Sequence, residues 1–103
     1  MSAAREQCWI IRGIEAEPPA DADLEQIRQL HHAYIDQLDR EGLLVAHGAT
    51  RDENGERSGT GLIVIRAATR AQALGIARRE PYVAHGVRTL ELMPWQMQRG
   101  GGG

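Results

Sequence analysis

Two residues of this 103-residue chain have the types and positions needed for proton-transfer chemistry, His31 and Glu80. His31 follows Ile27 and precedes Tyr34 and Leu38 at steps of three and four, which places it on the apolar face of a helix. A histidine can take up and release a proton near neutral pH. The same position also suits a histidine that is only hydrogen-bonded within the core.

Glu80 stands directly before Pro81, and the residue before a proline seldom remains helical. We therefore expect the second helix of the chain to end at Glu80. A carboxylate is disfavoured at the negative end of a helix dipole unless a positive partner holds it. A contact with His31 would supply that partner and would fix the imidazole tautomer that a general base requires. The alternative is that Glu80 is an ordinary solvated charge.

The other groups that could carry chemistry give weaker signals. His32 is turned by about 100° from His31 around the helix, and His47 and His85 have no evident partner in the sequence. The lone Cys8 lies in an apolar run, so we expect a small buried side chain rather than a reactive thiol. The chain contains no HExxH, CxxC or phosphate-loop pattern, and we expect neither a metal nor a cofactor.

Four short apolar segments rich in β-branched residues predict the strands that would position these groups. Pro94 is expected to end the last strand, because proline cannot donate a hydrogen bond to a sheet. Residues 82–86 are expected to form a tight connector before that strand. The predicted strands cover residues 6–14, 43–50, 59–67 and 87–93.

Two helices are expected between the strands. Asp21 or Asp23 can cap the first helix, and Gly42 follows its last turn, where a left-handed residue is typical. Thr69 can cap the second helix. The resulting order, strand-helix-strand-strand-helix-strand, is that of the ferredoxin-like βαββαβ fold of the α+β class. It predicts a four-stranded antiparallel sheet with two helices on one face.

Size and charge limit the classes of protein to which the chain can belong. We expect a single domain over residues 1–99 and a flexible glycine tail at 100–103. The net charge of −2, with twelve scattered arginines and no lysine, argues against nucleic acid as a partner and excludes lysine Schiff-base chemistry. No apolar run is long enough to span a membrane, so we expect a cytoplasmic protein. So short a chain is not expected to cover both faces of its sheet, which predicts a homodimer packed sheet to sheet.

Several segments resemble the YCII-related (YciI-like) family of the dimeric α/β-barrel group. In the first half, the resemblance lies in a helix histidine, the leucines after it and a glycine that ends the second strand. The second half matches the family ending, in which an acidic residue and a proline precede an aromatic residue. The matching stretches, which together extend over about residues 6–97, are 31–38, 41–44, Gly48, 73–74, Ala77, 80–83, 86–87 and 93–95.

Members of the family that this chain resembles have a ferredoxin-like fold and form dimers, sheet against sheet. A histidine and an aspartate that meet in a cleft are proposed there as a catalytic dyad. Carried over to this chain, the resemblance assigns the histidine to His31, with His32 as the alternative if the helix is shifted by one residue. It assigns the aspartate to Glu80, which is longer by one methylene group.

These observations predict a small cofactor-free enzyme that uses His31 and Glu80 for acid–base catalysis. The resemblance implies a lyase or an isomerase acting on a small organic acid or lactone. We expect Tyr82 and Thr50 to line the cleft and Arg12 or Arg66 to hold an anionic group of the substrate. Two alternatives stay open: a non-catalytic small-ligand-binding or accessory dimeric module, and a plain dimerisation module with no small-molecule site.

Overall fold

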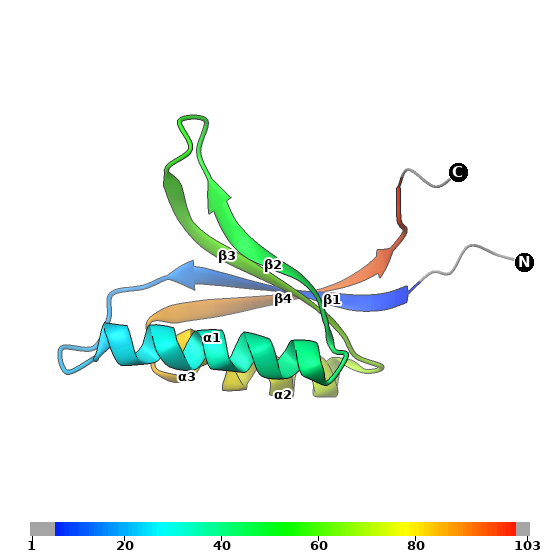
Figure 1. Cartoon of the computed structure of the whole chain (residues 1–103), viewed down its shortest axis with the longest axis horizontal. Helices are drawn as coiled ribbons and strands as arrows, with labels where there is room; N and C mark the ends of the chain where they lie inside the picture. The colour runs from blue at the N-terminus through cyan, green and yellow to red at the C-terminus, as the bar shows by residue number, and fades with distance from the viewer. Residues whose placement is uncertain (1–5, 101–103) are drawn as a thin grey trace, which may run out of the picture.

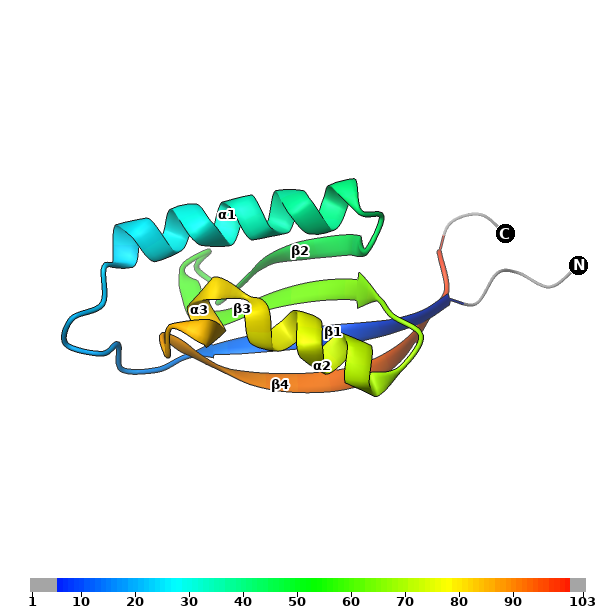
Figure 2. The same ribbon diagram turned by 90° about the horizontal axis from the view of Figure 1, so that it is seen from below.

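The layer that carries the fold is a four-stranded antiparallel sheet with the strand order β2-β3-β1-β4. The computed structural model describes residues 6–100, so the expected glycine tail lies outside the described residues apart from Gly100. Figures 1 and 2 show that the helices lie together on one face of the sheet. The α+β ferredoxin-like fold is thus confirmed. The elements are β1 (Glu6–Glu15), α1 (Leu24–Arg40), β2 (Leu44–Arg51), β3 (Arg57–Arg66), α2 (Arg70–Arg79), α3 (Pro81–Ala84) and β4 (Arg88–Met97).

Two capping side chains mark where α1 and α2 begin, and a glycine marks where α1 ends. The carboxylate of Asp23 accepts the backbone N–H of Gln26, and the hydroxyl of Thr69 accepts the N–H of Gln72. Gly42 has a φ of 74°, a left-handed conformation that glycine adopts without steric cost, and turns the chain from α1 towards β2. The three caps expected from the sequence are therefore confirmed, with Asp23 as the first.

The core lies between the helices and the sheet. Alternate residues of β1 and β3 point to the helices, as the period of a strand requires, and meet the apolar stripes of α1 and α2. Truncating one large aliphatic side chain in such a core typically costs about 2–5 kcal/mol. The buried cluster consists of Trp9, Ile11, Ile35, Leu38, Ile63, Ile65, Ala73, Ile76 and Ala77.

The structure differs from the predicted elements in two places, the connector after α2 and the end of the last strand. Residues 81–84 form a one-turn helix, α3, in place of part of the tight connector, because Pro81 suits the first position of a helix. Strand β4 does not stop at Pro94 but continues to Met97. It lies at the edge of the sheet, where the missing N–H of a proline faces no neighbouring strand.

The face of the sheet opposite the helices is open and carries a row of apolar side chains. Ile10, Val64 and Met93 occupy adjacent positions across three strands on that face. The side chains of Met93 and Trp95 are 43% and 39% exposed. No helix in the described part of the chain has the length and hydrophobicity needed to cross a membrane.

Candidate active site

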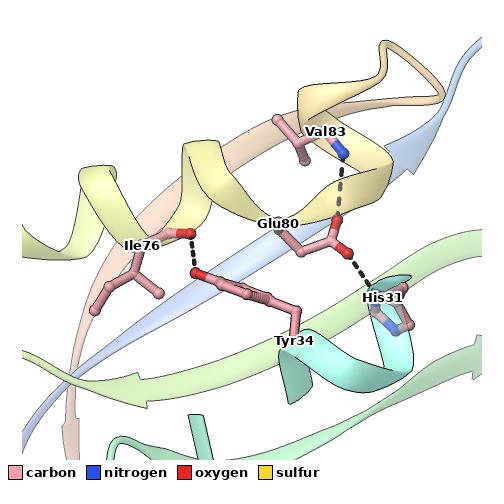
Figure 3. A network of polar contacts seen from close by, with 5 residues as sticks. All are labelled: His31, Tyr34, Ile76, Glu80 and Val83. Carbon is pink, nitrogen blue, oxygen red and sulfur yellow. Dashed lines mark hydrogen bonds and ion pairs between the residues drawn. The ribbon is translucent and has the colours of Figure 1, made fainter. Parts of the chain in front are cut away.

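His31 and Glu80 are in direct contact on the side of the sheet that carries the helices. The Nδ1 atom of His31 lies at hydrogen-bonding distance from Oε1 of Glu80, as Figure 3 shows. The second carboxylate oxygen of Glu80 accepts the backbone N–H of Val83 at 3.3 Å. A carboxylate only accepts hydrogen bonds, so Nδ1 carries the donated hydrogen, and in a neutral imidazole Nε2 is then the proton acceptor. The contact predicted from the sequence between these two residues is confirmed.

The backbone explains how Glu80 reaches this position. Glu80 ends α2 with an extended conformation, φ −60° and ψ 124°, and is at the same time the N-cap residue of α3. Its side chain is 2% exposed, and its carboxylate occupies the start of a helix, where negative charge is favoured. The expectation that the helix dipole opposes this carboxylate was therefore incomplete, because it considered only the helix that Glu80 ends.

Tyr34 fixes α1 against α2 one turn beyond His31. Its hydroxyl donates a hydrogen bond of 2.5 Å to the backbone carbonyl of Ile76 in α2 (Figure 3). Burial raises the pKa of the Tyr34 phenol, so the group remains a hydrogen-bond donor at neutral pH. Because α1 carries His31 and α2 leads into Glu80, this bond also sets the spacing of the histidine and the carboxylate.

A cleft of about 330 Å³ opens beside His31, whose side chain is 14% exposed. Residues of α1 form one wall, residues of the β2–β3 hairpin form the second, and Tyr82 and Arg88 form the third. The volume is at the lower end of the range found for small-molecule sites. The lining residues are Arg28, His31, His32, His47, Gly48, Ala49, Arg51, Arg57, Gly61, Leu62, Ile63, Tyr82 and Arg88.

The cleft is strongly positive although the chain as a whole has a net charge of −2. Four of the twelve arginines contribute to its wall, and none of the described residues that line it is Asp or Glu. A cleft lined by one sign of charge raises the local concentration of ligands of the opposite sign. The site therefore suits an anionic ligand. Among residues 6–100, no three His, Cys, Asp or Glu side chains lie close enough together to hold a metal ion.

Besides His31, two of the residues expected at the site line this cleft, Tyr82 and His32. The ring of Tyr82 packs against the imidazole of His31, with 4.7 Å between the ring centroids. His32, the alternative histidine, is exposed at the edge of the cleft, and its ring centroid is 5.5 Å from that of His31. Only His31 of the two contacts Glu80.

The structure places Arg12, Arg66 and Thr50 away from the cleft wall. Arg12 lies on the open face of the sheet and forms a 2.7 Å ion pair with Glu91. Arg66 contacts Glu6 at 2.8 Å and lines a separate groove of about 1050 Å³ beside α2 and the start of β1. The hydroxyl of Thr50 is bonded within the hairpin, to Ser58 at 2.6 Å and to the carbonyl of Thr60 at 3.1 Å.

The arginines that line the cleft were not predicted from the sequence. A signal was present for two of them. Arg28 lies three residues before His31, which is one helical turn on the same face. Arg88 alternates with Leu90 and Leu92, which pack against the core, so all three point to the helix side of the sheet.

The fold and this site define a small α+β protein in which a half-buried histidine borders a positive cleft and is paired with a buried carboxylate. The chain belongs to the YCII-related family, because the family model for the YCII-related domain matches residues 9–96. This agrees with the resemblance noted in the sequence. A comparison with curated proteins found no match.

A search of solved structures found two matches to report. One is 5-chloro-2-hydroxyhydroquinone dehydrochlorinase from Burkholderia phenoliruptrix, in complex with 2,5-dihydroxybenzoquinone. It has a TM-score of 0.61 and 12% identity, over 84% of this chain and 92% of that chain. The other is a de novo designed protein with a ferredoxin fold, with a TM-score of 0.41 and 15% identity, over 95% and 90% of the two chains. The first similarity supports the fold, and the protein in that structure is an enzyme.

Proposed function

We propose that this protein is a small enzyme that uses His31 and Glu80 for acid–base catalysis on a small organic acid or lactone, as a lyase or an isomerase and without a cofactor. The observation that carries the proposal is the contact between Nδ1 of His31 and the buried carboxylate of Glu80, at the wall of a cleft. In this arrangement the carboxylate orients the ring and fixes its tautomer. The imidazole then has one nitrogen left for the substrate.

In the proposed reaction, Nε2 of His31 removes a proton from a carbon atom of the substrate. The imidazolium that forms is stabilised by Glu80, whose buried carboxylate supplies the opposite charge. An isomerase returns this proton to a different atom of the same molecule. A lyase expels a leaving group together with its bonding electrons, and the proton is released to solvent or to the leaving group.

The structural neighbour supports an enzyme over a plain dimerisation module. That protein is named a dehydrochlorinase, and a dehydrochlorination removes a proton and a chloride from one molecule. Such an elimination is within the chemistry that a histidine with an oriented ring can perform. For the present chain, Tyr82 is proposed as a substrate contact, because its ring forms part of the cleft wall next to His31.

We also propose that the protein works as a homodimer in which the open faces of two sheets pack together. The apolar row of Ile10, Val64 and Met93 on this face supports the proposal, since a row of this kind is costly to leave in water. None of the described helices lies on this side of the sheet (Figure 1). The helix side, with the cleft, would then remain accessible to substrate.

A substrate screen tests the proposed function. Small unsaturated acids, lactones and hydroxylated quinones are incubated with the protein, and turnover and ligand-induced changes in melting temperature are both recorded. Turnover of any of these compounds supports the enzyme. A rise in melting temperature with no turnover of any compound supports the ligand-binding module instead, because a ligand that binds the folded state stabilises it without chemistry.

A further inference from the structure

We propose that Arg88 is the residue that binds the carboxylate of the ligand in this cleft, an inference that rests on the function proposed above and names its substrate class as small carboxylic acids. Arg88 is the first residue of β4 and lines the cleft together with His31 and Tyr82. Its guanidinium group is positioned by a pair of glycines and by the ring of Tyr82. Glu15 is its cross-strand neighbour on β1, but no carboxylate of the described residues forms an ion pair with Arg88.

Two glycines make room for the Arg88 side chain. Gly13 of β1 and Gly61 of β3 are directly paired across the sheet, and Arg88 lies over both. A Cβ atom on Gly61 would be 2.9 Å from Nη1 of Arg88, and one on Gly13 would be 3.0 Å from its Cδ. Neither glycine has a positive φ, so the backbone does not require glycine at these positions. A side chain at Gly61 would instead displace the end of the Arg88 side chain from its present position, and one at Gly13 would crowd the Arg88 Cδ atom.

The aromatic ring of Tyr82 holds the guanidinium group from another side. The Cζ atom of Arg88 is 4.1 Å from the centroid of that ring, a cation–π distance. The same ring packs against His31. Arg88 and His31 therefore both contact the ring of Tyr82. A guanidinium fixed in this way loses little conformational entropy when an anion binds to it.

Charge also favours an anion at this place. Arg51 and Arg57 are directly opposite each other across the β2–β3 hairpin, and both line the cleft. Like charges in such a pair repel each other, and an anion between the walls relieves that repulsion. None of the ion pairs among the described residues involves Arg51, Arg57 or Arg88, so their charges remain available to an external anion.

The volume of the cleft and the hydrogen-bonding geometry of a guanidinium group limit which anion can bind. The cleft of about 330 Å³ accepts a small molecule rather than a nucleotide. A planar guanidinium group forms two parallel hydrogen bonds with a carboxylate or a phosphate. We assign the carboxylate, because a carboxylic acid is the class in which an anion lies next to a carbon that His31 can deprotonate. On this assignment, Arg88 sets the position of the substrate and His31 carries out the proton transfer.

Binding of benzoate, measured by calorimetry or by NMR titration, tests this assignment without any turnover. The wild-type protein is expected to bind benzoate in the millimolar range, at least about tenfold more tightly than neutral benzamide or inorganic phosphate. The Arg88→Gln variant is expected to lose at least about tenfold in benzoate affinity, since a hydrogen bond to a charged group is lost. The matched control is Arg40→Gln, at an exposed arginine in the last turn of α1 outside the cleft wall, and it should bind as the wild type does.

A second variant separates the position of the guanidinium group from its charge. Gly61→Ala keeps all the arginines, but its new methyl group must push the end of the Arg88 side chain aside. It should weaken benzoate binding in the wild-type background and have no further effect in Arg88→Gln. Gly75→Ala, where a Cβ atom meets nothing within 4 Å, is the control for the substitution itself.

Three results would overturn the assignment: no benzoate binding by the wild type, equal binding by the Arg88→Gln and Arg40→Gln variants, or tighter binding of phosphate than of benzoate. Circular dichroism of each variant shows that the protein is folded. The outcome is separate from that of the proposed function. A His31→Asn variant that binds benzoate but has lost turnover supports both proposals, and an Arg88→Gln variant that binds normally contradicts only this one.

Discussion

The carboxylate of Glu80 bonds to the ring of His31, 49 residues away in the sequence, and to the backbone N–H of Val83 in the helix that Glu80 itself caps. One side chain thus joins α1, the end of α2 and the start of α3. This relationship gives the pair a structural role as well as the chemical role that we propose. Experiments on His31 and Glu80 must therefore separate loss of folding from loss of chemistry.

We expect the His31→Ala variant to be less stable than the wild type by about 3 kcal/mol, because it leaves the buried carboxylate of Glu80 without its main partner. The His31→Asn variant should lose less, since the asparagine amide can replace Nδ1 as a donor. Urea unfolding followed by circular dichroism measures both free energies of unfolding. His85→Ala, at an exposed histidine outside the cleft wall, is the control. Equal stability of the His31→Ala and His85→Ala variants would contradict the structural role.

The stability that Tyr34 contributes should depend on pH. Burial raises the pKa of its phenol above the ordinary 10.0, so the folded protein holds this proton more tightly than the unfolded chain does. The contribution is therefore complete below pH 10 and is lost as the pH rises above that value. The Tyr34→Phe variant should be less stable by about 1 kcal/mol at neutral pH, because the Ile76 carbonyl loses its donor. This difference should become smaller above pH 10.

Thermal unfolding of the wild type and Tyr34→Phe between pH 7 and pH 11 measures this effect. The ultraviolet absorbance of a Tyr82→Phe variant, in which Tyr34 is the remaining tyrosine, follows the phenol directly. A Tyr34 phenol that ionises below pH 10 in the folded protein would refute the prediction.

Cys8 should be unreactive in the folded protein. Its side chain is completely buried, and burial raises the pKa of the thiol, which lowers the fraction of reactive thiolate. A disulfide reagent such as Ellman's reagent should label one thiol after denaturation and label it far more slowly before. The Cys8→Ala variant should retain any turnover found in the substrate screen. Rapid labelling of the native protein, or loss of turnover in a folded Cys8→Ala variant, would point to thiol chemistry instead.

A charged residue on the open face of the sheet should separate the proposed homodimer. In Met93→Glu, a carboxylate would have to enter the apolar interface, and desolvating it without a partner is unfavourable. Analytical ultracentrifugation at micromolar concentration should show a dimer for the wild type and a monomer for Met93→Glu. Leu30→Glu is the matched control, because Leu30 of α1 is also 43% exposed but lies on the helix side. A wild-type monomer would contradict the proposal.

The contact between His31 and Glu80 could be predicted because local rules restrict both residues. Helical periodicity directs His31 towards the core, and Pro81 ends the helix at Glu80. The additional cap at α3 could not be foreseen, because a helix of four residues leaves no periodic pattern. The prediction that the last strand ends at Pro94 was wrong for a similar reason. A proline is tolerated within β4 because β4 is an edge strand, and the order of the strands is a property of the whole fold.

Which arginines line the cleft could not be predicted from the sequence. Twelve arginines are spread along the chain, and each side chain is long enough to reach several neighbours. Arg12 and Arg66 were expected to hold an anionic group, but both are paired with glutamates outside the cleft. The position of Arg88 follows from the register of three strands and from the absence of side chains on Gly13 and Gly61. The space that Arg88 occupies is formed only in the folded protein.

The turnover number of the His31→Asn variant tests the central claim most directly. This variant keeps a donor for Glu80 but lacks the second ring nitrogen that would accept the substrate proton. With a compound that the wild type converts, we predict a loss of at least about a hundredfold in kcat, as for the removal of a general base, while the circular dichroism spectrum stays that of the folded protein. A folded His31→Asn variant with the kcat of the wild type would contradict the account.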